Sequence, residues 1–247
     1  MGIEEIREKA DKFFDARKYT EALPYYEQAA ELGDVYSIAK AATLRSLNAI
    51  FNIKVFKDFP CAEENADAAM QWYNKIEDIQ SLAVDTIFDK HAFSCCLGYC
   101  YYRIGTKKGD DNEKGDSFGN SFYLLCNVVD DDKTALDIQG LWALSLQGLQ
   151  DLAWDVSNDA IARKNEIYEA ATGKSKEAFL ACEYGASLLP KIFVDYGFVL
   201  LEGRELSADH TKAYHCFKNA FEMGIQSAGG LLGKFTETAP GKYTFVG

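Results

Sequence analysis

The residue types that bind metals or act as nucleophiles occur in only a few spaced pairs. His91 and Cys95 are four residues apart, as are Cys96 and Cys100, and this spacing can place two ligands on one face of a helix. Because a helix has 3.6 residues per turn, Cys95 and Cys96 point about 100° apart, so the two pairs do not converge. We interpret these thiols as small apolar side chains at a contact between helices, beside Gly98.

Two other patterns resemble functional motifs, but the residues around them do not complete either motif. His210 and His215 have no further ligand at a suitable spacing, so we interpret them as structural or solvated residues. The segment Thr-Gly-Lys-Ser at 172–175 matches the end of a phosphate-binding P-loop, but Tyr168 stands where that motif requires its first glycine. We expect this glycine to end one helix and this serine to cap the next.

Two acidic runs, 110–111 and 130–132, suggest calcium, but neither belongs to a twelve-residue loop that ends in a bidentate glutamate. We also find no strand-turn-helix signature of a nucleophilic serine. The sequence therefore predicts no catalytic, cofactor-binding or metal-binding residues, no cofactor, and a protein that is not an enzyme. Spacing alone does not test a Ser-His-Asp or Cys-His site, so an enzyme of unknown class remains an alternative.

Composition narrows the classes of partner and the compartment. The chain has 247 residues, 48% of them hydrophobic, with 38 acidic and 26 basic side chains and a net charge of −12. This charge repels nucleic acids and anionic membranes, although it also serves simple solubility. No basic leader with an apolar segment and no apolar run of about 18 residues occurs, so we expect a soluble cytoplasmic protein.

The cysteines point to the same compartment. There are seven, an odd number, and most lie within helical apolar patterns. That usage fits free thiols in a reducing environment.

Apolar spacing predicts a chain of helices. Ile6, Ala10 and Phe14 lie on one face of a first helix, and Gly33 follows a second helix as its terminating glycine. Between 176 and 235, small residues recur where two helices must touch and glycines recur where helices must end. Only four prolines interrupt the chain, which suits helices.

Two repeat families share these patterns. The block Ala10-x(2)-Phe13…Tyr19-x(2)-Ala22-x(3)-Tyr26-x(2)-Ala29 closely resembles a tetratricopeptide repeat. Later segments resemble the related Sel-one-like repeat, whose unit is a hairpin of two helices. In that repeat a small residue on the first helix of each hairpin lies where the two helices cross. The matching positions here are Ala42, Gly98, Gly140, Gly197 and Gly233.

The resemblance implies an all-α αα-superhelix (solenoid) of about five to six antiparallel helical hairpins. We expect a single array over 1–235 with insertions near 51–64 and 154–174, followed by an irregular tail at 236–247.

In such an array the first helices form a concave groove. The resemblance places eight residues on its wall: Phe14, Asp15, Tyr99, Tyr102, Arg103, Leu144, Phe198 and Glu202. Aromatic residues and isolated arginines often carry interface energy. Phe14 and Phe198 have an alternative role as core between stacked repeats.

We therefore predict a non-catalytic scaffold or adaptor that binds a peptide or a partner domain in this groove. The expected partner is a protein or peptide with a basic or neutral surface, and neither nucleic acid nor a membrane. The alternative is a regulatory or accessory subunit, with homo-oligomer formation left open, that binds through its outer face or an insertion.

Overall fold

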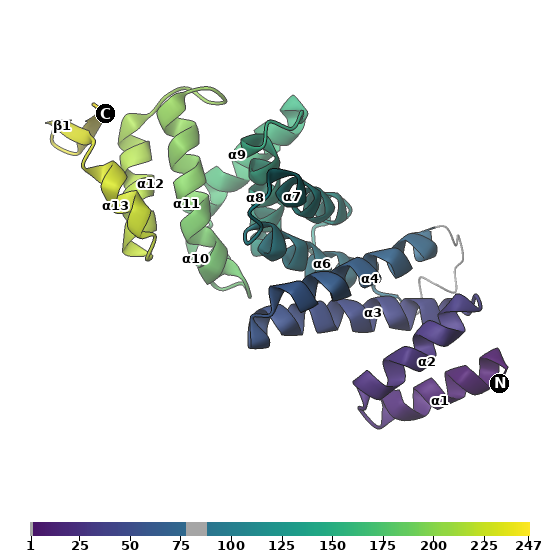
Figure 1. Ribbon diagram of the computed structural model, residues 1–247. Helices are drawn as coiled ribbons and strands as arrows, with labels where there is room; N and C mark the ends of the chain where they lie inside the picture. Colours follow the sequence, from purple (N-terminus) through teal and green to yellow (C-terminus); the bar gives the residue numbers. More distant parts are fainter. Residues whose placement is uncertain (1, 78–87) are drawn as a thin grey trace. The chain divides into compact units, whose positions relative to one another are not determined.

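The structure, a computed structural model, describes residues 2–77 and 88–247, and these are mostly helical (Figure 1). This confirms the all-α class in its coarse form, with the addition of two short strands. The chain divides into two compact units, Met1–Val128 (unit 1) and Val129–Gly247 (unit 2). The sequence predicted a single array over 1–235, with no division near residue 128.

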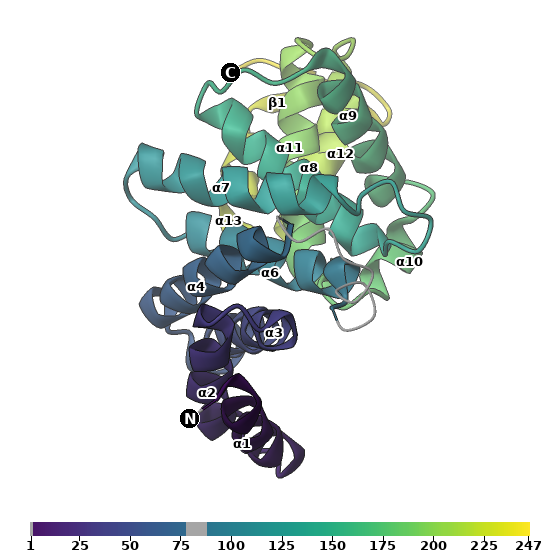
Figure 2. The same ribbon diagram turned by 90° about the vertical axis from the view of Figure 1, so that its right-hand side faces the viewer.

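Within its described residues, unit 1 is built from pairs of consecutive helices. The first pair is α1 (Ile3–Asp15) and α2 (Tyr19–Glu31). The second is α3 (Val35–Phe51) and α4 (Phe59–Glu77), and a π-helix, η1 (Asn52–Phe56), continues α3. The third is α6 (Lys90–Gly105) and α7 (Asp111–Cys126). Within each pair the two helices pack on each other, and α3 also packs on α2 and α6 (Figures 1 and 2).

Local sequence explains where these helices begin and end. Asp34, Asp89 and Asp110 each accept a hydrogen bond from a backbone N–H of the following helix, as N-cap aspartates do. Gly33 has a φ of 91°, a left-handed conformation that allows the chain to leave α2.

Gly98 brings α6 and α7 into close contact, as the sequence predicted. A Cβ at this position would lie 2.8 Å from Leu125 Cγ, closer than side chains pack. Ser121 Oγ also donates a 2.8 Å hydrogen bond to the carbonyl oxygen of Gly98. The absence of a side chain therefore sets the distance between these helices.

Unit 2 contains α8 (Leu136–Asp151), α9 (Asn158–Thr172), α10 (Lys176–Leu180), α11 (Gly185–Glu202), α12 (His210–Glu222) and α13 (Gln226–Leu232). Helix α8 packs on α9, and α11 packs on α12 (Figures 1 and 2). Gly140 faces Phe179, and Gly197 faces Phe217, both within contact distance of an added Cβ, so these crossing glycines are also confirmed. Gly233 is different, because it follows α13 and lies at no helix crossing.

Both predicted insertions prove to be largely helical. The segment 51–64 holds the end of α3, the π-helix and the start of α4, while 154–174 is mostly α9. After the second of these segments, Ala178 and Phe179 lie in the five-residue helix α10. The Thr-Gly-Lys-Ser segment ends α9 at Gly173, as expected, and Ser175 precedes α10 without a side-chain capping bond.

The predicted irregular tail is instead a β-hairpin. Strands β1 (Phe235–Ala239) and β2 (Lys242–Phe245) pair antiparallel around Gly241. The hairpin lies on α12, where the Tyr214 and Tyr243 rings stack with centroids 3.7 Å apart. Aromatic contacts of this kind can hold a short hairpin against a helix.

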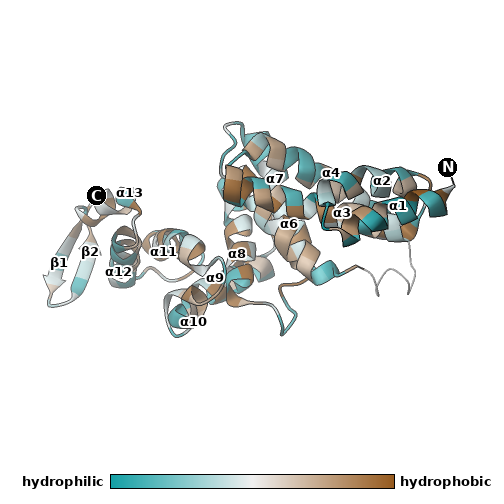
Figure 3. Cartoon of the chain, turned by 90° about the horizontal axis from the view of Figure 1, so that it is seen from below, coloured by the Kyte–Doolittle hydropathy of each residue, from teal (hydrophilic) through white to brown (hydrophobic). Residues whose placement is uncertain are grey.

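Apolar and polar residues are interspersed along the helices. Figure 3 shows brown apolar and teal polar residues alternating along the helices, which matches helices with one buried face. No helix among the described residues is both long and apolar enough to span a bilayer. No disulfide bond joins any of the seven cysteines, all of which lie within the described ranges.

Candidate functional site

Unit 1 carries an open apolar groove, here called the unit 1 groove. It has a volume of about 380 Å³ and lies between the end of α1, the middle of α3 and the start of α6. Its wall is mainly apolar, with one lysine and one aspartate. The lining residues are Phe14, Tyr19, Lys40, Thr43, Leu44, Ser46, Leu47, Asp89, Ala92, Phe93 and Cys96.

Aromatic residues of the first hairpin build one side of the groove. The Phe14 ring packs edge-on against Tyr19 and Tyr26, with centroids 5.2 Å and 6.1 Å apart. Lys40 Nζ lies 4.3 Å from the centre of the Phe14 ring, a cation–π distance. Phe14 therefore lines this groove and also packs within its own hairpin.

The floor of the groove is formed where α3 meets α6. The Cys96 thiol lies 3.7 Å from the carbonyl oxygen of Ser46, whereas Cys95 Sγ lies 3.8 Å from His91 Nδ1. Cys95 and Cys96 thus have different partners, as their angular separation predicted. Within the described ranges, no three histidine, cysteine or acidic side chains are grouped as metal ligands.

The other groove residues predicted in unit 1 lie elsewhere. Asp15 is exposed at the end of α1 and does not line the groove. Tyr99 and Tyr102 are each only 4% exposed, and Tyr102 packs against Phe118 of α7. Arg103 donates a 2.7 Å hydrogen bond to the Tyr99 hydroxyl. Tyr99 and Tyr102 therefore present little surface to a partner.

Unit 2 contains a polar cavity of about 740 Å³, here called the unit 2 cavity. Helix α8, helix α11 and the turn after α11 contribute its lining: Gln147, Gln150, Asp151, Asp195, Phe198, Val199, Glu202, Arg204 and Glu205. Two predicted residues, Phe198 and Glu202, are among them. The third prediction in this unit, Leu144, is 3% exposed and belongs to the core.

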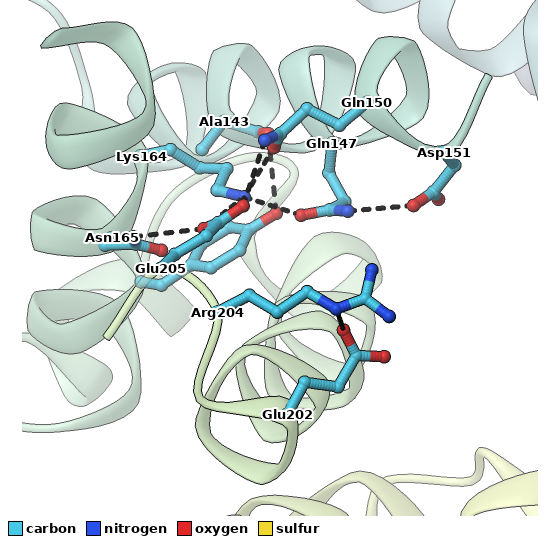
Figure 4. Close-up of polar contacts among 10 residues, drawn as sticks. Ala143, Gln147, Gln150, Asp151, Lys164, Asn165, Glu202, Arg204 and Glu205 are labelled. Carbon is cyan, nitrogen blue, oxygen red and sulfur yellow. Dashed lines mark hydrogen bonds and ion pairs between the residues drawn. The ribbon is translucent and has the colours of Figure 1, made fainter. Parts of the chain in front are cut away.

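A fully buried lysine organises one wall of this cavity (Figure 4). Lys164 Nζ donates to Gln147 Oε1 at 2.7 Å, to Gln150 Oε1 at 2.6 Å and to Glu205 Oε1 at 3.1 Å. Asn165 Nδ2 donates to the other Glu205 oxygen at 3.1 Å. An ammonium group has three donors, so this set of acceptors satisfies it completely.

The pKa shifts of this pair reflect burial and mutual contact. Burial lowers the pKa of Lys164, and the hydrogen bond to Glu205 opposes that effect. For Glu205, burial acts to raise the pKa, but the donors Lys164, Asn165 and Gln150 outweigh it and the pKa is lowered. The contact with Glu205 therefore favours the charged form of Lys164, whose side chain is not among those that line the cavity.

Asp195 makes the cavity sensitive to pH. It is partly buried on α11, and burial together with the negative charge of Asp151 raises its pKa to about 7. Glu202 is exposed and pairs with Arg204 at 3.3 Å. The wall therefore holds more acidic than basic groups, which disfavours an anionic occupant.

Sequence reasoning missed most of the cavity residues. One signal was present: Lys164 stands on the buried face of α9, one helical turn before Ile167 and Tyr168. A lysine on an apolar face requires buried acceptors. Its partners Gln147, Gln150 and Glu205 come from other segments, so only the fold identifies them.

Comparison with known proteins gives no further guidance on this site. No protein-family model matches the sequence, and a search of curated proteins found no relative.

Proposed function

We propose that the protein is a non-catalytic scaffold or adaptor that binds a peptide or partner domain in the unit 1 groove. The observation that carries the proposal is the groove itself, an open apolar depression beside exposed Tyr19 and Leu47. Apolar depressions with aromatic walls are common sites of partner recognition. In this proposal the helix pairs of unit 1 stack as tetratricopeptide-like repeats, which is supported by the packing of α3 on both α2 and α6.

The groove favours an apolar anchor over a charged one. Its two charged groups, Lys40 and Asp89, are of opposite sign, and Lys40 Nζ is held over the Phe14 ring. A short apolar side chain would displace water from Leu44, Phe93 and Ala92 without stranding a charge. The proposal includes a cytoplasmic location, which the free thiols support.

Site-specific photocrosslinking tests the groove directly. A benzophenone amino acid placed at Ala92, inside the groove, is compared with the same group at Gln28, which is exposed on α2 outside it. We expect position 92 alone to capture one partner segment, identified by mass spectrometry from cells that make the protein.

A substitution then measures affinity for that segment. Ala92→Trp fills the groove from an exposed position, and we expect it to weaken binding at least about tenfold. Gln28→Trp is the matched control and should leave binding unchanged. Unchanged affinity in Ala92→Trp would contradict the proposal. Equal crosslinking from positions 28 and 92 would also contradict it, and would favour the alternative role as an accessory subunit that binds through its outer face.

A further inference from the structure

One edge of β2 is paired with side chains of α12 instead of a third strand. Backbone N–H groups two residues apart point to the same edge of a strand. The N–H of Tyr243 donates to Thr211 Oγ1 at 3.0 Å. The N–H of Phe245 donates to His210 Nδ1 at 3.3 Å. The first turn of α12 therefore supplies acceptors that hold this strand.

The contact with Phe245 requires one particular state of the His210 ring. A backbone N–H only donates a hydrogen bond, so Nδ1 must offer a lone pair and the imidazole proton must lie on Nε2. Protonation of the ring adds a hydrogen at Nδ1, and two donors then face each other. Docking of β2 and protonation of His210 therefore compete.

The second acceptor on this edge does not respond in the same way. The Thr211 hydroxyl accepts from the Tyr243 N–H and donates to the Tyr243 carbonyl oxygen at 3.4 Å. A hydroxyl neither gains nor loses a proton between about pH 5 and 8, whereas an imidazole does. Of these two contacts, only the one made by His210 changes with pH.

Aromatic rings of the hairpin also pack on α12. Tyr214 and Tyr243 stack with centroids 3.7 Å apart. Phe235 packs against Tyr214 at 5.6 Å and against Phe217 at 6.1 Å. A hairpin of two strands is at best marginally stable by itself. Loss of one contact with α12 is therefore enough to change how often this hairpin opens.

Charged or titratable side chains also occur on the elements around His210. They are Glu202 on α11, Asp209, Lys212 and His215 on or before α12, and Lys234, Glu237 and Lys242 on or before the strands. Within the described ranges, none of them forms a hydrogen bond or ion pair with the His210 ring. Asp209 Oδ1 accepts the Lys212 N–H at 2.9 Å, and Glu237 Oε1 accepts the Gly241 N–H at 2.8 Å.

We propose that the hairpin is a pH-sensitive latch on α12, held by the neutral imidazole of His210 and loosened when that imidazole is protonated. Loosening lifts the Tyr243 ring from Tyr214 and uncovers an aromatic surface on α12. The latch lies within unit 2, so the inference goes beyond the proposed function and does not depend on the unit 1 groove.

Heteronuclear NMR of the full chain tests both parts of the latch. Long-range proton–nitrogen correlations identify the tautomer of His210, and we expect its proton on Nε2 at about pH 7.5. Amide exchange of Tyr243 and Phe245, divided by the exchange rate of an unstructured chain at the same pH, measures docking. This protection should fall about fivefold between about pH 7.5 and about pH 5.5.

Substitutions separate titration of the ring from its structural role. In His210→Asn the amide oxygen takes the position of Nδ1 and accepts the same N–H at either pH, so protection should be retained without the fall. His210→Leu removes the acceptor and should give low protection at both pH values. His215→Asn is the matched control, because the His215 ring contacts Tyr243 edge-on at 5.9 Å. This variant should keep the full response to pH.

Several outcomes would overturn the inference. In the natural chain these are a proton on Nδ1 of His210 at about pH 7.5, or equal protection of Phe245 at both pH values. Both measurements stand whether or not the variants fold, which circular dichroism shows. Among the variants, the inference fails if the fall persists in His210→Asn, if His210→Leu keeps full protection at neutral pH, or if His215→Asn loses the response.

A general loss of stability at low pH does not imitate the latch. Burial raises the pKa of Asp195 to about 7, so this group makes the folded state more stable, and not less, as the pH falls. Exchange across α8 and α9 in the same spectra provides the internal reference. A fall in protection confined to the hairpin is therefore attributable to its own contacts with α12.

Discussion

Lys164 Nζ and Glu205 Oε2 lie 3.0 Å apart in unit 2, and the lysine side chain has no exposed surface. The contact joins α9 to the turn after α11, two segments separated by forty-one positions in the sequence. Because Lys164 also holds Gln147 and Gln150, one ammonium group fixes three side chains of the cavity wall (Figure 4). The rigidity of this wall thus depends on a single buried charge and its partner.

Removing only one member of this pair should be more harmful than removing both. Lys164→Met leaves the Glu205 carboxylate without its cation, and we expect a loss of about 3–5 kcal/mol in the free energy of unfolding. Lys164→Met with Glu205→Gln removes both charges and should recover at least half of that loss. Urea unfolding measures both values. A double variant whose loss equals the sum of the single losses would show that the two residues are not coupled.

Asp195 should make stability fall as the pH rises toward neutrality. Its folded pKa of about 7 lies above its ordinary value of 3.8, so the folded state binds this proton more tightly than the unfolded chain. Ionisation between these two values therefore destabilises the folded state. We expect Asp195→Asn to stabilise the protein relative to the natural chain more at about pH 8 than at about pH 5, by on the order of a few kcal/mol. Thermal unfolding at both pH values tests this, and an equal effect at both would contradict the assignment.

Gly98 and Gly119 offer a matched pair in the α6/α7 hairpin. Gly98→Ala would place a Cβ 2.8 Å from Leu125, which is fully buried, and should cost about 1–3 kcal/mol. Gly119→Ala meets no atom within 4 Å and should stabilise α7 by about 0.5–1 kcal/mol. Urea unfolding of both variants gives the comparison. Equal effects would show that α6 and α7 are not held at the distance described.

These glycines also show what local sequence can predict. The glycines at 98, 140 and 197 indicate close contacts between helices, because a side chain at these positions would overlap a residue of the neighbouring helix. Periodic apolar residues likewise predicted the helices and their terminating glycines. These features depend on neighbours along the chain or on one size constraint, so sequence is sufficient to find them.

The functional surfaces could be predicted only in part. Phe14 lines the unit 1 groove, and Phe198 and Glu202 line the unit 2 cavity, but Tyr102 is buried against Phe118. A repeat pattern predicts which face of a helix points inward. Small changes in the rotation of the helix decide whether that face contacts solvent or another helix. The π-helix at 52–56 has no sequence signature, and yet its last residue, Phe56, packs against Phe51 of α3.

The C-terminal hairpin should detach when its aromatic contact is removed. Tyr243 stacks on Tyr214, and its backbone N–H donates to Thr211 Oγ1 at 3.0 Å. Tyr243→Ala removes the ring, and we expect hydrogen exchange to rise across β1 and β2 while α8 and α9 are unaffected. Tyr243→Phe retains the stack and serves as the control. Unchanged protection in Tyr243→Ala would show that strand pairing alone holds the hairpin.

The left-handed residue after the π-helix yields a final test, in which two glycine substitutions remove the same charge. Lys57 has a φ of 54°, so Lys57→Gly relieves backbone strain and should raise the free energy of unfolding by up to about 1 kcal/mol. Lys54 lies within η1, so Lys54→Gly should instead lower the free energy of unfolding by about 1 kcal/mol, because glycine loses more backbone entropy than lysine in a helix. Urea unfolding compares the two variants in the full chain. Both variants lose one lysine, so opposite signs would point to the backbone conformation of Lys57 rather than to the loss of charge alone. If both substitutions destabilise equally, Lys57 is not held in the left-handed conformation, and the ending of the π-helix would need a different explanation.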